Sequence, residues 1–395
     1  MHDYFPGVYW PNLVLHNGLA CGAKFDDLHN ASAAGRAHLI AGGQDTDPEF
    51  VTALYDGHLA RAAQLESHAQ EALQHGYAFT AGSKYIEAAV FYMVMDFLTH
   101  YSDPRKKAAL LKARDTFWKG LSMAPGRHAQ AQRLEVPLEG EMLDALFVPA
   151  QSSEAKVPLV IHLNGTHSTL EWPYLLGLTE YLAQRGIASL TIDHPGSGTA
   201  IHAKGMIQRY ESEVFVGAII DFMAQRDDVD TSRIGVCGAS MGGYVAPRAT
   251  IFDNRIAACA CLGALYEFPK DLWGLKGDET ATMHFTETEM AGLHWSFGAA
   301  NHAEFLDIVD KFSLEGLMDR MTVPLFVVHG KNDYQIPLEQ AERMVREAVN
   351  SPRAELCIAD EKMGGVEHCN CDNTEPTVLK LADWFGDVFN TRTAR

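Results

Sequence analysis

The segment Gly238-Ala239-Ser240-Met241-Gly242 has the pattern G-x-S-x-G. An apolar run precedes it and a helical stretch follows, so the serine is expected on a sharp turn between a strand and a helix. The glycines are needed because a side chain on either one would collide across such a turn. An ordinary Gly/Ser turn is the alternative. The strand before it and the helix after it favour Ser240 as a nucleophile.

A serine hydroxyl needs a base to take its proton, and the base needs a carboxylate to orient it. His368 lies late in the chain, in the segment GGVEHC, and Asp333 follows the apolar run 324–329. The chain order Ser, Asp, His is the one expected for partners of this turn. The chain has eighteen histidines, most of which are expected on the surface, so position after predicted strands selects these two. His329 is interpreted as a packing residue at a strand end.

Two backbone N–H groups are candidates for an oxyanion hole. Met241 follows the serine at the start of the helix, where its N–H can face the developing oxyanion. The second donor is expected from the loop 164–169, which follows the apolar run 159–163. Gly165 permits close approach there, and the Thr166 N–H is the predicted donor.

Other chemistries find less support. The cluster His368-Cys369-Asn370-Cys371 is too compact for structural zinc, which needs four ligands in two well-spaced pairs. The turn 193–198, DHPGSG, lacks the spacing of a P-loop or a dinucleotide fingerprint. We therefore expect neither a metal nor a cofactor.

The elements around these residues predict an α/β protein. Residues 132–138 and 142–148 flank Glu139-Gly140, which is a hairpin signal. Short apolar runs alternating with helical stretches follow, as expected for a mostly parallel, doubly wound sheet. This is the layout of the α/β-hydrolase fold. The runs are residues 159–163, 187–192, 233–237, 256–262, 324–329 and 354–358.

The first 125 or so residues indicate helices, one beginning at Asp47-Pro48 with Asp47 as N-cap. A second is expected at about 82–100 and a third from Asp103-Pro104. We predict a helical N-terminal cap domain over 1–127, a catalytic domain over 128–262 and 323–395, and a helical lid insertion over 263–322. The insertion's aromatic residues either line a lid or pack it against the core: Trp273, Phe285, Trp295, Phe297 and Phe305.

Composition limits the partners. The formal net charge of −19 argues against nucleic acid and anionic membrane surfaces. No apolar run reaches the roughly 18 residues of a membrane span, and the start, MHDYFPGVYW, does not resemble a signal peptide. Seven scattered cysteines do not suggest a disulfide framework. A cytoplasmic protein with a small-molecule substrate, apolar or aromatic, is the expectation.

Several segments between residues 77 and 388 resemble one group of α/β-hydrolases. They include Phe79–Gly82, the turn 193–198, GASMGGYVAPR at 238–248, and GGVEHC at 364–369 with Asp372-Asn373. The group contains 2,6-dihydroxypseudooxynicotine hydrolase, fungal polyketide-shortening hydrolases and fermentation-respiration switch esterases. By position, Ser240, Asp333 and His368 match the triad of this group.

The resemblance also implies a helical domain that covers the active site, and a homodimer. The chain departs from the group in two places. Relatives have paired glycines and a leucine where this chain has Asn164-Gly165-Thr166, and an acidic pair is replaced by Glu171-Trp172.

Four functions remain open. The resemblance favours hydrolysis of a carbon–carbon bond beside a ketone, with His368 protonating the leaving carbanion, helped by Glu171, Glu211 or Asp271. Hydrolysis of an ester, lactone or thioester needs no extra acid. Acyl transfer would need a pocket that excludes water. A non-catalytic binding protein is disfavoured because all three triad residues are present.

Overall fold

The computed structural model describes residues 1–101, 103–124, 130–166, 168–269 and 287–390. The chain separates into two compact units, Met1–Ala131 and Gln132–Arg395. The sequence-based boundary after residue 127 lies close to this division. Within the described ranges, no helix is long and apolar enough to cross a membrane.

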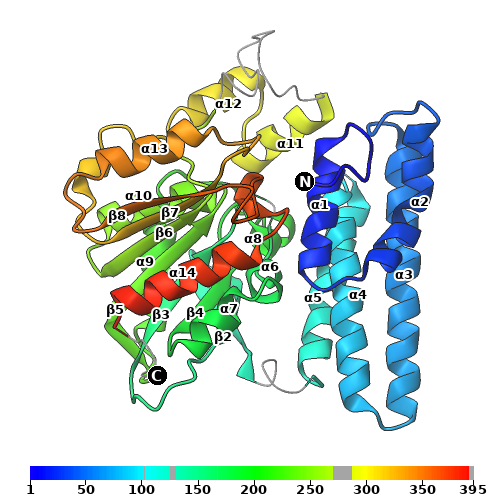
Figure 1. The fold of residues 1–395 in the computed structure, drawn as a ribbon, viewed down its shortest axis with the longest axis horizontal. Coiled ribbons are helices and arrows are strands. Elements are labelled where there is room, and N and C mark those ends of the chain that lie inside the picture. The colour runs from blue at the N-terminus through cyan, green and yellow to red at the C-terminus, as the bar shows by residue number, and fades with distance from the viewer. Residues whose placement is uncertain (102, 125–129, 167, 270–286, 391–395) are drawn as a thin grey trace. The chain divides into compact units, whose positions relative to one another are not determined.

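The N-terminal unit consists of helices joined by short loops (Figure 1). Asp103 caps α5, because its carboxylate accepts a hydrogen bond from the Arg105 N–H at 2.9 Å. Asp47 occupies the N-cap position of α3 but makes no capping bond; its carboxylate instead accepts from the Gln44 N–H. The helices are α1 (Tyr9–Ala20), α2 (Phe25–Ile40), α3 (Pro48–Gln74), α4 (Ala78–Leu98) and α5 (Pro104–Leu121).

Helix α4 is the centre of this unit and packs against both α3 and α5. Gly82 on α4 and Gly120 on α5 let these two helices approach closely, since a Cβ on Gly82 would lie 2.9 Å from the Gly120 carbonyl oxygen. A buried ion pair, Lys106 to Asp96 at 3.2 Å, also joins α5 to α4. The predicted helical character of this region is therefore confirmed.

The second unit contains an eight-stranded sheet in the order β1-β2-β4-β3-β5-β6-β7-β8, counted over the residues described. The opening β1–β2 hairpin is antiparallel and turns at Glu139 and Gly140, both with positive φ. β2 pairs antiparallel with β4, and all later pairs are parallel. The strands are β1 (Gln132–Leu138), β2 (Glu141–Val148), β3 (Val157–Leu163), β4 (Ala188–Ile192), β5 (Val229–Ala239), β6 (Ile256–Leu262), β7 (Leu325–Gly330) and β8 (Ala354–Ala359).

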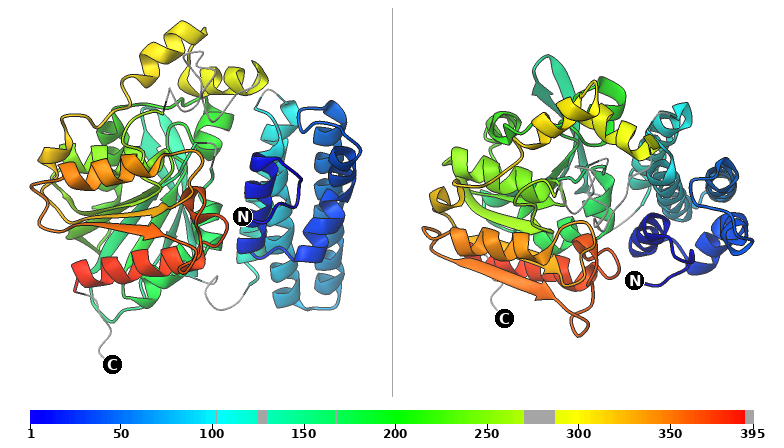
Figure 2. Two further views of the ribbon diagram at one scale, coloured as in Figure 1. Left: turned by 45° about the horizontal axis from the view of Figure 1, so that its top comes forward. Right: turned by 90° about the horizontal axis from the view of Figure 1, so that it is seen from above.

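Helices cover both faces of this sheet (Figures 1 and 2). Successive side chains of a strand point to opposite faces of the sheet, so alternate strand residues contribute to two separate hydrophobic cores. On β7, Val327 packs with one core and Val328 with the other. The first core includes residues of α9 (Ser212–Met223), α10 (Gly242–Phe252) and α13 (Leu338–Glu347). The second includes residues of α7 (Leu178–Gln184) and α14 (Glu375–Val388). This is the α/β-hydrolase fold that the sequence predicts.

The segment between β6 and β7 contains α11 (Glu287–Phe297) and α12 (His302–Val309). Phe297 and Phe305 are buried, and their ring centroids lie 5.5 Å apart. These two aromatic residues thus pack the insertion against the core. Trp273 and Phe285 lie outside the described residues, and the role of the insertion as a lid stays a prediction.

Candidate active site

Ser240 stands on a strained turn between β5 and α10. Its φ is 57°, in the left-handed region that a non-glycine residue rarely adopts. A Cβ on Gly238 would collide with the Gly242 carbonyl, and one on Gly242 would collide with the Leu163 carbonyl. The Ser240 N–H donates to Leu262 O at 3.0 Å, which anchors the turn to the end of β6.

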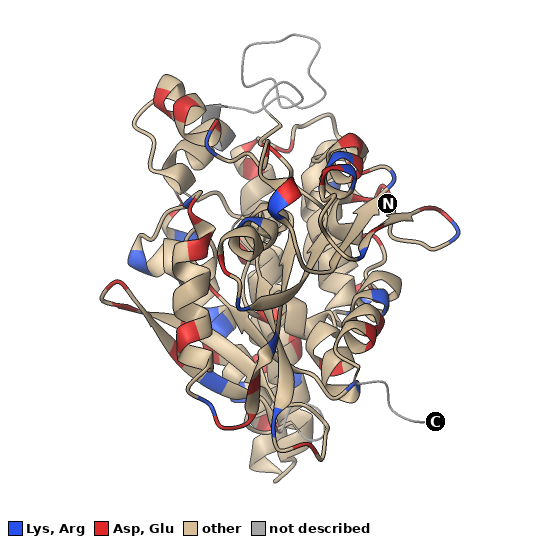
Figure 3. Cartoon of the chain, turned by 90° about the vertical axis from the view of Figure 1, so that its left-hand side faces the viewer, with Lys and Arg blue, Asp and Glu red and all other residues tan. Residues whose placement is uncertain are grey.

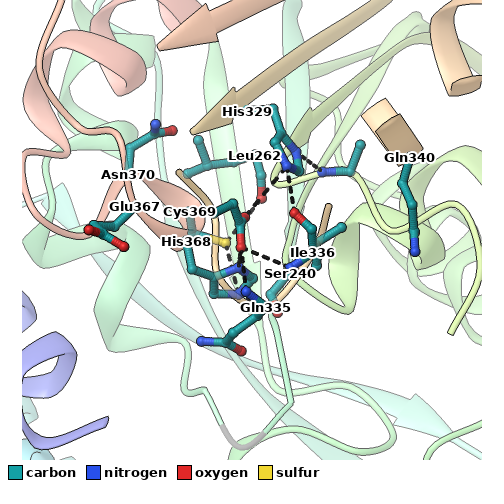
Figure 4. A network of polar contacts seen from close by, with 12 residues as sticks. Ser240, Leu262, His329, Gln335, Ile336, Gln340, Glu367, His368, Cys369 and Asn370 are labelled. Atoms are coloured by element: carbon teal, nitrogen blue, oxygen red, sulfur yellow. Dashed lines mark hydrogen bonds and ion pairs between the residues drawn. The ribbon is translucent and has the colours of Figure 1, made fainter. Parts of the chain in front are cut away.

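The structure brings the three predicted residues together at the carboxyl end of the parallel strands. His368 Nε2 lies 2.9 Å from Ser240 Oγ, and His368 Nδ1 lies 2.9 and 3.0 Å from the two Asp333 oxygens. Figure 4 shows Ser240 beside His368. Asp333 follows β7, and His368 opens the short turn His368–Asn370 after β8. The Asp333 carboxylate also accepts from the Gln335 and Ile336 N–H groups, which fixes its orientation.

Burial and charge act in opposite directions on this pair. Burial lowers the pKa of His368, but the Asp333 carboxylate and the Cys369 sulfur together raise it by more, so it lies well above its ordinary value. For Asp333, burial raises the pKa while His368 lowers it by more, and the net pKa falls below the ordinary value. The pair therefore favours an imidazolium facing a carboxylate.

His329 lies on the other side of Asp333 and is fully buried. Its Nδ1 accepts from the Ala264 N–H at 3.2 Å, so the ring proton is on Nε2, which donates to Ile336 O at 3.0 Å. Burial lowers the pKa of His329, which favours the neutral ring. His329 thus joins the loops after β6 and β7 (Figure 4).

Gly165, which directly precedes the predicted donor Thr166, lies close to Ser240. A Cβ on Gly165 would sit 3.0 Å from Ser240 Cβ and 3.5 Å from its Oγ. Within the part of the chain that the structure describes, neither the Met241 N–H nor the Thr166 N–H donates a hydrogen bond. Their role as the donors of an oxyanion hole stays a prediction.

The two predicted accessory acids within the described residues lie on different elements. Glu171 opens α6 (Glu171–Leu175) and is 1% exposed. Glu211 precedes α9 and is hydrogen-bonded to the Tyr210 hydroxyl, which raises the pKa of Tyr210. Asp271 lies outside the described residues. Direct hydrogen bonds join the side chains of three predicted residues, Ser240, His368 and Asp333.

Cys369 is a neighbour of the site that the sequence reasoning assessed only as a metal ligand. Its thiol donates to Leu262 O at 3.2 Å and lies 3.6 Å from His368 Nε2. Cys369 has a φ of 49°, and this turn directs its side chain back toward the base. Across the described residues, no group of three or more His, Cys, Asp or Glu side chains is placed to hold a metal ion.

Comparison with known proteins shows that this chain is similar to several hydrolases over most of its length. Hydrolase LUC6 of Fusarium sp is 24% identical over 427 residues, covering 99% of both chains. The 2,6-dihydropseudooxynicotine hydrolase of Paenarthrobacter nicotinovorans is 25% identical over 354 residues, 88% of each chain. The crystal structure of the 2,6-dihydroxy-pseudo-oxynicotine hydrolase aligns with a TM-score of 0.75 at 21% identity, over 96% of this chain and 97% of that one. That likeness shows the fold.

The fold and these relatives define an enzyme, a hydrolase of the α/β-hydrolase class. The family model described as "Esterase FrsA-like" matches residues 58–348. The chain belongs to this FrsA-like esterase family, and the resemblance drawn from its motifs is confirmed. The match begins within α3 and ends just after α13, so it includes helices of both units.

Proposed function

We propose that this protein is a serine hydrolase in which Ser240 attacks a carbonyl carbon, His368 is the base and Asp333 orients His368. The observation that carries the proposal is the unbroken chain of hydrogen bonds from Ser240 Oγ through both nitrogens of His368 to Asp333. A chance Gly/Ser turn would not place its serine 2.9 Å from a histidine 128 residues away.

The reaction proposed first is hydrolysis of a carbon–carbon bond next to a ketone. As Ser240 Oγ bonds to the carbonyl carbon, its proton passes to His368 and the oxyanion accepts from the Met241 and Thr166 N–H groups. The carbon–carbon bond then breaks, its electron pair forms an enolate, and His368 returns the proton to that carbon. Water, deprotonated by His368, finally releases a carboxylic acid from Ser240.

The electrostatics of His368 support this first reaction. An enolate carbon is a poor leaving group unless it is protonated, so the donor must hold its proton through bond cleavage. The raised pKa of His368 favours uptake of the Ser240 proton, which the imidazolium can then pass to the leaving group in this reaction and in ester hydrolysis alike. Relatives named 2,6-dihydropseudooxynicotine hydrolase and 20-hydroxy-prefusarin hydrolase support a small-molecule substrate.

Ester, lactone or thioester hydrolysis is the second candidate, and the esterase description of the family favours it. An alkoxide or thiolate leaves more readily than an enolate, so the same triad suffices. We also propose that the substrate is apolar or aromatic and that the protein is a homodimer. A further proposal is that the helical N-terminal unit and the lid cover the site.

One experiment separates the two reactions. The purified protein would be incubated with aryl β-diketones and with aryl esters of varied chain length, beside Ser240→Ala. Cleavage of a diketone to an acid and a ketone, lost in Ser240→Ala, is the expected result. Rapid ester turnover with inert diketones would establish the esterase alternative, and activity retained in Ser240→Ala would falsify the serine mechanism.

A further inference from the structure

The turn DHPGSG after β4 has no part in the mechanism above, yet it is buried and extensively hydrogen-bonded. Asp193 is fully buried, and its carboxylate accepts from the Leu170 N–H at 2.9 Å and the Thr199 N–H at 2.7 Å. Ser197 Oγ accepts from the His194 N–H at 2.9 Å and donates to His194 O at 3.0 Å. The backbone of His194 is therefore held on both sides.

The His194 ring is held as firmly as its backbone. It is fully buried and stacks on Phe215, with centroids 5.2 Å apart and an interplanar angle of 9°. Its Nε2 lies 3.1 Å from Asn164 O and its Nδ1 lies 3.0 Å from Pro195 O. Burial lowers the pKa of His194 despite these two carbonyls and Asp193, so the ring is neutral and has one N–H to share between two acceptors.

The Asn164 carbonyl stands at the start of the predicted oxyanion loop. A trans peptide is planar, so holding Asn164 O also orients the Gly165 N–H. Gly165 O in turn accepts from the Ser168 N–H at 3.2 Å, which directs the Thr166 N–H the opposite way. The Asn164 side chain adds a bond from Nδ2 to Ile192 O at 3.2 Å. Of the two successive peptide planes beside Ser240, the first is thus held by His194 from outside the loop, and the second is held by Ser168 within it.

We propose that His194 is a positioning residue of the oxyanion hole, with its Nε2–H donating to Asn164 O and holding the loop that presents the Thr166 N–H to Ser240. The proposal rests on the proposed function, because it takes Ser240 as the nucleophile. The role fits the geometry, because His194 follows β4 and supplies the loop after β3 with a fixed point from the neighbouring strand.

Three substitutions of His194 distinguish the role of its Nε2 from the role of its Nδ1. In His194→Gln the side-chain amide can reach Asn164 O as Nε2 does. In His194→Asn the shorter amide reaches only the Pro195 side, and His194→Phe keeps a ring against Phe215 without a donor. Each would be compared with wild type for kcat, KM and the affinity of an aryl trifluoromethyl ketone, which forms an oxyanion when Ser240 adds to it.

A loosened oxyanion hole lowers kcat and leaves KM almost unchanged, because the donors act mainly on the transition state. We expect His194→Asn and His194→Phe to lose about 10- to 100-fold in kcat and a similar factor in ketone affinity. His194→Gln should stay within about threefold of wild type. Equal kcat values in the three variants would overturn the proposal. Equal losses of kcat in His194→Gln and His194→Phe would also overturn it, provided that both variants have the melting temperature of wild type.

A measurement on the wild-type protein does not depend on how the variants fold. In protein labelled with ¹⁵N-histidine, the resonances absent from His194→Gln belong to His194, and their shifts report which nitrogen carries the proton. A proton on Nε2 is expected, and a proton on Nδ1 would overturn the assigned bond. If Ser240→Ala kept wild-type turnover, the proposed function would fail, while this spectrum would still decide the bond from His194 to Asn164.

Discussion

At the scale of single residues, the site depends on opposed effects of burial and charge. The side chain of Asp333 is fully buried, yet its pKa is lowered because His368 and the Ile336 N–H face the carboxylate. His368 is nearly as buried, yet its pKa is raised because the carboxylate favours the protonated ring. Each residue thus depends on the other for its charge state.

The pH profile should report this coupling. Only neutral His368 can take the proton of Ser240, so kcat/KM should rise with pH through the raised pKa, above the ordinary value of about 6.5. Asp333→Asn removes the charge that favours the imidazolium, so the acid limb should move to lower pH while kcat falls by about 10⁴. Profiles of kcat/KM against pH for both proteins test this. An acid limb at the same pH in both would contradict the coupling.

Gly165 allows the oxyanion loop to approach the nucleophile. In Gly165→Ala the new methyl would sit 3.0 Å from Ser240 Cβ and 3.2 Å from Ala239 O, so the loop must move away. We expect kcat to fall by about 10- to 100-fold. Gly217→Ala is the matched control, because its Cβ would meet only Arg255 and Asp253 at ordinary contact distances. Similar kinetics for both variants would show that Gly165 is not needed at this position.

At the scale of elements, one helix carries a buried titratable group far from any catalytic residue in the sequence. His58 on α3 is fully buried, and its Nδ1 donates to Leu54 O at 2.8 Å. Its Nε2 has no hydrogen-bond partner among the described residues. Burial lowers the pKa of His58 to about 4. Folding therefore holds this ring neutral over a range where the unfolded chain protonates it.

This difference predicts acid sensitivity. The stability that a neutral His58 provides is complete above the unfolded pKa of about 6.5 and is lost as pH falls toward 4. Between pH 7.5 and pH 5.0, wild type should lose about 2 kcal/mol more than His58→Asn, which keeps a donor for Leu54 O but does not titrate. Urea unfolding at both pH values measures the free energy of unfolding of each protein. His68→Asn, on the exposed side of α3, is the control. Equal losses in wild type and His58→Asn would refute the assignment.

At the scale of the whole molecule, the two units have separate cores. The large cores lie within Gln132–Arg395, whereas the cluster around Tyr85 lies within Met1–Ala131. Figure 3 marks Lys and Arg in blue and Asp and Glu in red along the ribbon, and both colours recur on many of its elements. The net charge of −19 is thus spread over the chain rather than confined to one tail.

Residues 132–395 form a compact unit with their own hydrophobic cores, so they should fold without the helical unit, and they contain every candidate catalytic group. The fragment should react with a fluorophosphonate at Ser240 within about tenfold of the full-chain rate, a barrier difference of ~1.4 kcal/mol. Mass spectrometry of the labelled peptide and circular dichroism of the fragment provide the test. A folded fragment that is inert to the reagent would mean that the helical unit completes the site.

Several features of the backbone depend on a few adjacent residues and could therefore be predicted from the sequence. The Ser240 turn, the hairpin at Glu139-Gly140 and the start of α5 at Asp103-Pro104 each depend on a few adjacent residues whose steric preferences decide the backbone. The alternation of strands and helices predicted a mostly parallel sheet, whereas the order of its strands came from the structure. The chain order of the triad followed from the same layout.

The tertiary structure decided which distant side chains meet. His194 reaches the carbonyl of Asn164, Cys369 lies beside His368 Nε2, and His329 joins Ala264 to Ile336. Phe297 and Phe305, ambiguous in the sequence, are buried in the core. A residue's own neighbours set its backbone, but contacts between strand ends depend on the register and packing of the whole sheet, which no short segment encodes.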